Sequence, residues 1–101
     1  TPRIAQEIQG GTGEEVLDRK CQVLNKSGED VTKEFIRGAE ETLKIAKLFH
    51  ITEFIGKSKS PSCGCGQIYD GTFSQKLING DGVTVALLKR NRIRIITEED
   101  L

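Results

Sequence analysis

The clearest periodic pattern of apolar residues in the chain lies between Thr32 and Phe49. Apolar side chains recur there every three or four positions and so form one stripe on a helix: Val31, Phe35, Ala39, Leu43 and Ala46. Asp30 or Thr32 can accept hydrogen bonds from the first free amides of that helix. Glutamates early in the segment and lysines late in it suit the helix dipole. The pattern therefore predicts a helix from about Thr32 to Phe49.

The N-terminal third has weaker periodicity. Residues 14–25, EEVLDRKCQVLN, predict a helical turn followed by a short strand. Cys21 and Val23, together with Arg19, would lie on one face of that strand, so Cys21 is expected to be a small buried side chain. The glycine-containing stretches at 10–13 and 26–30 are typical of turns, because glycine adopts the positive φ that turns require.

The C-terminal half predicts a second helix between two short strands. The expected elements are a strand at 52–56, a helix at 82–91 and a strand at 93–96. Asp81 can cap the helix, and Asn91 is the candidate for a left-handed residue at its end. The stretch that follows Gly56 and runs to Asn79 has little periodicity and is expected to be a long irregular loop, a feature that is often functional in small domains.

This order of elements favours an α/β fold, because strands separated by helices usually form a parallel sheet with right-handed crossovers. The expected architecture is a partial Rossmann-like parallel sheet flanked by helices. Ligands of such sheets gather beyond the C-terminal ends of the strands. Cys63 follows the strand expected at 52–56, so its position favours a functional loop.

Composition narrows the class of protein. A chain of 101 residues has room for one small domain or part of one. Fifteen basic and fifteen acidic residues balance to a net charge of zero, so nothing requires nucleic acid or a membrane surface as a partner. No apolar run approaches the roughly 18 residues of a membrane span. Three scattered cysteines are unlike a secreted disulfide scaffold and favour a reducing cytoplasm. The chain contains no Met and opens on polar residues, and is therefore expected to be the later part of a longer protein.

The segment SPSCGCG, residues 60–66, holds the residues that are most suited to chemistry. A thiolate is both a nucleophile and a metal ligand, and Lys57 and Lys59 beside the loop favour the thiolate form. The hydroxyls of Ser60 and Ser62 flank Cys63. A single Cys-x-Cys pair is a weak metal signal, since zinc sites usually need two pairs. An ordinary Gly/Ser-rich turn with incidental cysteines is therefore the alternative at this point.

A longer block of motifs identifies the class of protein more specifically than the Cys-x-Cys spacing does. The stretch SPSCGCGQIYDGTFSQKLINGDGVTVALLKRNRIRII resembles the thiouracil desulfurase family, also known as domain of unknown function 523. The family carries Ser-Pro-Ser-Cys-Gly, then Ile-Tyr-Asp-Gly-Thr-Phe, then Gly-x-Gly-Val-Thr before an Ala-Leu-Leu helix. TPR near the start and DVTKEFIRGAEETL also fit the family, so the resemblance covers essentially all 101 residues.

The resemblance implies an enzyme with a [4Fe–4S] cluster that removes sulfur from thiouracil or a related thiolated base without net redox change. It implies that Cys63 is a cluster ligand and that the Ser60 hydroxyl lies beside the open iron. In the family, two further cluster cysteines and a catalytic acid lie upstream of Thr-Pro-Arg, so two ligands are missing from this chain. Cys65 and Cys21 stand where the family needs no cysteine, and neither is expected to replace a ligand. Residues 1–101 are thus expected to form a single, incomplete domain that is inactive in isolation.

Several alternatives stay open. One is a non-catalytic remnant that binds a small anion or a partner chain through the strand-end loop, and another is a redox or metal thiol pair of Cys63 and Cys65. Thiolated tRNA is the second substrate class, and Arg3 is a candidate for anion or substrate contact. A missing first strand would expose a sheet edge suited to pairing, which favours a homo-oligomer.

Overall fold

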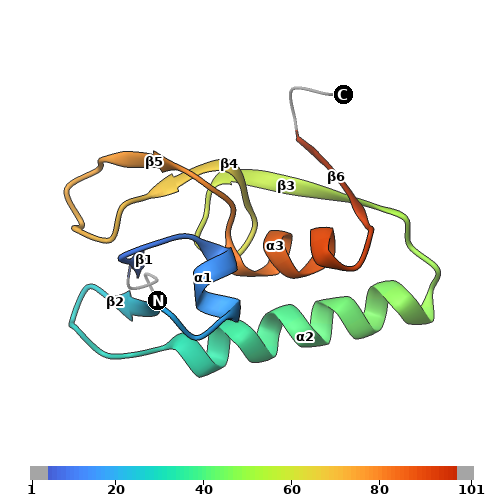
Figure 1. The fold of residues 1–101 in the computed structure, drawn as a ribbon, viewed down its shortest axis with the longest axis horizontal. Coiled ribbons are helices and arrows are strands. Elements are labelled where there is room, and N and C mark those ends of the chain that lie inside the picture. Colours follow the sequence, from blue (N-terminus) through green and yellow to red (C-terminus); the bar gives the residue numbers. More distant parts are fainter. Residues whose placement is uncertain (1–4, 98–101) are drawn as a thin grey trace.

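The computed structural model describes residues 5–97 and contains two sheets and three helices in that part of the chain. In chain order the elements are β1 (Gln6–Gln9), α1 (Gly13–Leu17), β2 (Gln22–Asn25), α2 (Thr32–Leu48), β3 (Glu53–Lys59), β4 (Gly64–Tyr69), β5 (Leu77–Asn79), α3 (Val83–Arg90) and β6 (Arg94–Thr97) (Figure 1). β1 and β2 form a small antiparallel sheet, and the larger sheet has the order β5-β4-β3-β6.

The α/β class is confirmed, and the larger sheet is mixed. β3 pairs in parallel with both β4 and β6, whereas β4 and β5 are antiparallel. The ladder between β3 and β4 is short, and its register shifts between Lys57 and Lys59. Lys59 has a φ of 70°, a left-handed conformation that bends the end of β3 into the following turn.

The prediction of an irregular loop between Gly56 and Asn79 is wrong. This stretch contains the end of β3 and the hairpin of β4 and β5. The hairpin leaves little apolar periodicity in the sequence, since Ile68 is its one fully buried apolar side chain and Gly66 and Gln67 are exposed. Its order comes from backbone pairing, with Gln67 opposite Asn79 and Tyr69 opposite Leu77. Such pairing joins residues eight to twelve positions apart, which a local pattern does not reveal.

Three smaller expectations at element ends are also corrected. Arg19 and Cys21 precede β2, and Arg19 has a left-handed φ of 60°, so neither belongs to the strand. The N-cap of α3 is Gly82, not Asp81. Asn91 has a φ of −103°, and the left-handed residue after α3 is Arg92, with a φ of 64°.

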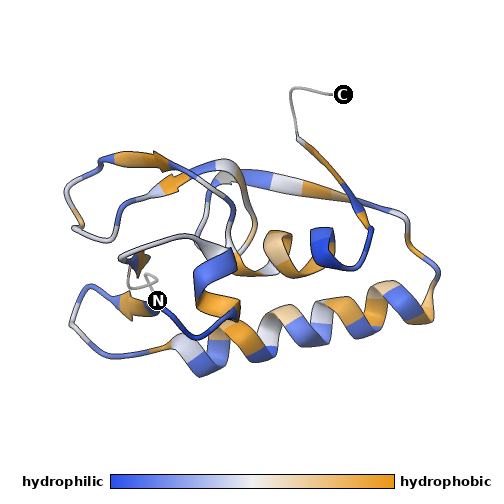
Figure 2. Cartoon of the chain, viewed as in Figure 1, coloured by the Kyte–Doolittle hydropathy of each residue, from blue (hydrophilic) through white to orange (hydrophobic). Residues whose placement is uncertain are grey.

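The helices α3 and α2 lie on one side of the larger sheet (Figure 1). α3 is nearer the sheet, and α2 packs against α3. Figure 2 shows apolar residues in the first turns of α3 and hydrophilic residues at its end, and a mixture of both along α2. The core has two clusters of buried side chains: Ile8, Val16, Val23, Ala39, Ile68 and Val83 in one, and Ala46, Leu88 and Ile93 in the other. In the first two turns of α3, five residues are buried, so this helix is held from nearly all sides.

The other face of the sheet is open in the described part of the chain. Phe54 and Ile95 pack against the core, so by strand alternation their neighbours Ile55 and Ile96, which pair across β3 and β6, point away from it. Ile55 is 51% exposed. No helix within residues 5–97 is long and apolar enough to cross a membrane.

Candidate functional site

A tight turn, residues 60–63, carries Cys63 from the end of β3 to the start of β4. The Ser60 hydroxyl oxygen accepts hydrogen bonds from the amides of Ser62 (3.1 Å) and Cys63 (3.0 Å). The Gly64 amide donates to the Ser60 carbonyl (2.8 Å), and the Lys57 amide donates to the Cys63 carbonyl (2.8 Å). Ser60 thus closes the turn by a side-chain turn motif and holds Cys63 directly.

The same turn is docked on the N-terminus of α3. The Pro61 carbonyl accepts from the Val83 amide (2.8 Å), and the Ser62 carbonyl accepts from the amides of Thr84 (2.9 Å) and Val85 (3.3 Å). No side chain caps α3, so these carbonyls satisfy the amides that the first helical turn leaves unpaired. Because those amides are already bonded, they are not available for an anion, which argues against anion binding at this helix end.

Glycines allow the turn, α3 and α1 to approach at backbone distance. A Cβ on Gly82 would lie 2.5 Å from the Ser62 carbonyl oxygen, and one on Gly64 would lie 2.4 Å from the Ser60 carbonyl oxygen. A Cβ on Gly13 would lie 2.3 Å from the Gly82 carbonyl oxygen, and the Gly13 amide donates to the Asp81 carbonyl (2.7 Å). The position of Cys63 is therefore set by backbone packing that reaches from α1 through α3 to the turn.

The structure brings Ser60, Ser62 and Cys63 together and leaves Cys21 in a different setting. The half-buried Cys63 Sγ lies 3.7 Å from the Ser62 hydroxyl oxygen. Cys65 belongs to β4 and lies beside Gly56, whose added Cβ would be 3.1 Å from the Cys65 Cβ. Cys21 Sγ lies 3.7 Å from the Thr12 carbonyl oxygen. All three are free thiols, and the redox alternative for Cys63 and Cys65 stays an untested prediction.

Among the described residues, few side chains able to bind a metal lie close to Cys63, which limits how a four-iron cluster could be held. Within residues 5–97, no three His, Cys, Asp or Glu side chains gather closely enough to hold a metal ion. A four-iron cluster is held by several cysteine thiolates. The described residues therefore do not fit such a cluster as a complete ligand set, and Cys63 is a candidate for one ligand only.

Two carboxylates outside the sequence-predicted site, Asp81 and Glu7, hold the surroundings of the turn. Asp81 accepts from the Gly66 amide (2.9 Å) and from the Lys89 ammonium group (2.9 Å), which links β4 to α3. Glu7, only 8% exposed, accepts from the amides of Gly71 (3.0 Å) and Phe73 (3.1 Å) and links β1 to the β4–β5 loop. A lone carboxylate in a short polar strand gives no sequence signal for such a role.

The loop that Glu7 holds contains the Asp-Gly turn of the IYDGTF motif. Asp70 Oδ1 accepts from the Thr72 amide (3.0 Å) and from the Thr72 hydroxyl (2.6 Å). These bonds lower the pKa of Asp70 from its ordinary value. These local bonds indicate a structural turn. Arg3 lies outside the described residues.

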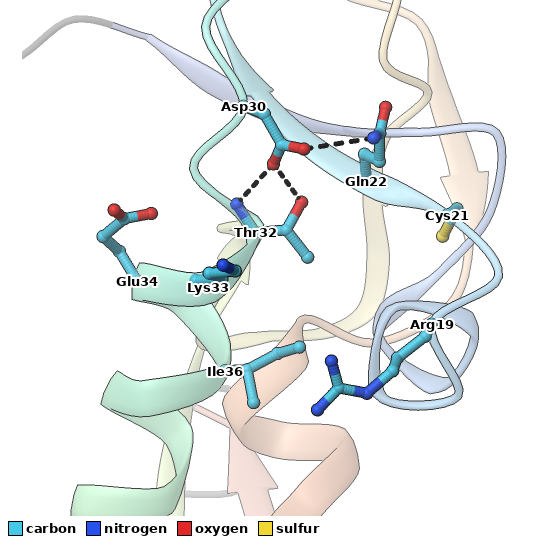
Figure 3. A pocket seen from close by; sticks show the side chains of 8 residues that line it. All are labelled: Arg19, Cys21, Gln22, Asp30, Thr32, Lys33, Glu34 and Ile36. Atoms are coloured by element: carbon cyan, nitrogen blue, oxygen red, sulfur yellow. Dashed lines mark hydrogen bonds between the residues drawn. The ribbon is translucent and has the colours of Figure 1, made fainter.

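A cavity of about 440 Å³ lies at the junction of β2 and α2, and no residue of the turn at 60–63 lines it. In Figure 3, Asp30 accepts from the Thr32 amide (2.8 Å) and from Gln22 Nε2 (3.1 Å), and these bonds tie β2 to the start of α2. The lining residues are Arg19, Cys21, Gln22, Asp30, Thr32, Lys33, Glu34 and Ile36. The cavity is therefore separate from the candidate site at Cys63.

Cys21, which lines this cavity, is expected to be a poor nucleophile. Burial, and after it the charge of Glu15, raise the pKa of the Cys21 thiol, so the thiolate fraction near pH 8 is lowered. We expect iodoacetamide to alkylate Cys21 more slowly in the folded chain than in the same chain unfolded in urea. The substitution Glu15→Gln should raise the folded-state rate, and equal rates in buffer and urea would contradict the assignment.

Comparison with known proteins places the chain in a family. A solved structure of a [4Fe-4S]-dependent thiouracil desulfidase, TudS (DUF523Vcz), matches with a TM-score of 0.86 and 42% identity; the match covers 100% of this chain and 60% of that one. The uncharacterized protein YbbK of Bacillus subtilis (strain 168) is 52% identical over 101 residues, which are 100% of this chain and 67% of YbbK. The family model for 2-thiouracil desulfurase matches residues 1–100. This chain belongs to the 2-thiouracil desulfurase family.

Proposed function

We propose that the full protein removes sulfur from thiouracil or a related thiolated base, in an iron–sulfur-dependent reaction without net redox change. Water replaces the sulfur at the carbon of the base, and the sulfur leaves as hydrogen sulfide, so atoms and electrons balance. Family membership and the similar [4Fe-4S]-dependent thiouracil desulfidase support this proposal. The observation that carries it for this chain is the turn that fixes a half-buried Cys63 directly after β3.

Cys63 is the proposed thiolate ligand supplied by this part of the protein. The rigid turn supports this role, because an ordered thiol loses little conformational freedom on binding. The remaining ligands are proposed to come from outside residues 5–97, since within that range no three metal-binding side chains gather at one place. When bound, such a cluster supplies a Lewis acid for the substrate sulfur.

Ser60 is the proposed catalytic hydroxyl. Its oxygen accepts two amide hydrogen bonds, from Ser62 and Cys63, so its lone pairs are engaged and its proton is the free part of the group. A hydroxyl held in this way can donate to a polar atom of a base that lies beside the turn. Orientation of the substrate, rather than proton abstraction, is therefore the role that the geometry supports.

The proposal includes finer statements about context. We propose that residues 1–101 belong to one desulfurase-family domain; the chain spans 60% of the length of the solved relative. A free thiolated base is the first substrate class and thiolated tRNA the second. A reducing, cytoplasmic setting suits three free thiols. An edge of the larger sheet is the proposed contact between copies in a homo-oligomer. Light scattering after size-exclusion chromatography measures the molar mass and so tests this oligomeric state.

The decisive test is anaerobic reconstitution with iron and sulfide. It uses a longer form of the protein, one that matches the full length of the relatives. We expect about four iron atoms and four acid-labile sulfides per chain, the content of one cluster. Cys63→Ala should abolish both, while the matched variant Cys65→Ala should retain them. Release of uracil and sulfide from 2-thiouracil, followed by chromatography, should show the same dependence on Cys63.

The 101-residue chain is the comparison sample in that experiment. We expect it to bind less than a full cluster and to release no sulfide. A full complement of iron on this chain would mean that a second copy supplies ligands. Iron binding that persists in Cys63→Ala of the longer form would exclude Cys63 as a ligand and contradict the proposed site.

A further inference from the structure

We infer that Thr84 is a positioning residue for Cys63 and acts through Ser62, an inference that rests on the proposed function. The Ser62 and Thr84 hydroxyl oxygens are 2.8 Å apart, and Cys63 Sγ lies 3.7 Å from the Ser62 hydroxyl oxygen. A continuous path of polar atoms therefore leads from the first turn of α3 to the sulfur.

The hydroxyl of Thr84, where this path begins, is buried and held in place. Thr84 is 3% exposed and is one of five buried residues that hold α3 in the interior. A buried hydroxyl without a partner is unfavourable, and the described residues contain no buried side-chain nitrogen or oxygen without one. The pairing of Thr84 with Ser62 satisfies both groups at once.

Ser62 and Thr84 are joined twice. Besides the hydroxyl pair, the Thr84 amide donates to the Ser62 carbonyl (2.9 Å). The backbone bond fixes where Ser62 lies, and the hydroxyl pair fixes the rotamer of its side chain. Because Ser62 is adjacent to Cys63 in the chain, that rotamer decides whether a hydroxyl stands beside the sulfur.

The chemical consequence concerns the sulfur of a metal-ligand cysteine. Hydrogen bonds to a ligand sulfur orient it and tune the metal group that it holds. Ser62 is the candidate donor to Cys63 in the ligand form, and Thr84 keeps that donor in place. Ser60 holds the backbone of Cys63 from the other side, so the two serines of the motif have different tasks.

The test measures the alkylation of Cys63 by iodoacetamide in the 101-residue chain, at one fixed pH and resolved by peptide mass spectrometry. Thr84→Val keeps the shape and removes the hydroxyl, so Ser62 is free to rotate. In this metal-free chain the Cys63 thiol is the donor and the Ser62 hydroxyl oxygen the acceptor, so loss of this bond frees the thiol to react. We expect the Cys63 rate to rise about fivefold, the factor that one hydrogen bond of typical net strength contributes. Thr84→Ser should restore the original rate within about twofold, because it keeps the hydroxyl.

Two further measurements separate positioning from general loosening. Cys21 is the internal reference, and its rate should be unchanged in Thr84→Val. Ser62→Ala removes the same pair from the other side and should reproduce the effect on Cys63. The inference is overturned if Thr84→Val leaves the Cys63 rate unchanged, or if Cys21 accelerates with Cys63 in both variants. No iron is involved, so failure here is distinct from failure of the proposed desulfurase function.

Discussion

Replacing Gly82 by alanine is expected to lower the free energy of unfolding by about 3 kcal/mol or more, and to displace Cys63. The added Cβ would lie 2.5 Å from both the carbonyl carbon and the carbonyl oxygen of Ser62, and 2.7 Å from the Pro61 oxygen. These are backbone atoms, so no flexible side chain can move aside. Either α3 or the turn at 60–63 must shift, and both hold Cys63 in place. Urea unfolding followed by circular dichroism measures the loss.

The matched control is Gly38→Ala on the exposed side of α2. A Cβ there meets nothing within 4 Å, and alanine is favoured over glycine inside a helix by roughly 0.5–1 kcal/mol. The same chemical change should therefore stabilise the chain at Gly38 and destabilise it at Gly82. If Gly82→Ala unfolds at the same urea concentration as the unsubstituted chain, the backbone contact between α3 and the turn is not as close as described.

The contrast between these two glycines indicates what local sequence reasoning can detect. The helix at Thr32–Leu48 was predictable because its apolar stripe repeats with the helical period and Ala39 and Ala46 are buried as that stripe requires. Gly38 lies inside one helix and Gly82 at the start of another, but nothing in the sequence around Gly82 shows that it contacts a distant segment. Their difference arises from contacts with a turn some twenty residues away, which only the folded chain reveals.

The candidate site shows the same division. Ser60 and Cys63 could be identified from residue types and from the resemblance, and the structure joins them by a hydrogen bond of 3.0 Å. Thr84 could not, because it follows Ser62 by 22 positions and lies in a helix whose sequence resembles an ordinary buried segment. The hairpin of β4 and β5 escaped prediction for a related reason: its order comes from cross-strand pairing and from Glu7.

Glu7→Ala should lower the free energy of unfolding by about 2–4 kcal/mol and release the loop between β4 and β5. One carboxyl oxygen, Oε1, accepts both the Gly71 amide (3.0 Å) and the Phe73 amide (3.1 Å), so alanine leaves two donors without a partner. Gly71 is also packed closely on β1, since an added Cβ would lie 2.5 Å from the Ile8 carbonyl oxygen. That contact excludes water from the Gly71 amide and makes its loss of a partner unfavourable.

Glu7→Gln is the control, because its amide oxygen can still accept both hydrogen bonds without the charge. Bonds to a charged group contribute more than neutral ones, so we expect a loss of about 1 kcal/mol for this variant. Amide hydrogen exchange gives the local measurement: Gly71 and Phe73 should exchange much faster in Glu7→Ala, whereas the amides of α2 should follow only the change in global stability. Equal stabilities of the two variants would show that packing, and not the acceptor oxygen, ties the loop to β1. This loop carries the IYDGTF motif, and the turn that positions the Cys63 thiol belongs to the preceding SPSCGCG segment. Release of the loop without displacement of Cys63 would therefore show that the two segments are held independently, the turn by α3 and the loop by the buried Glu7 carboxyl.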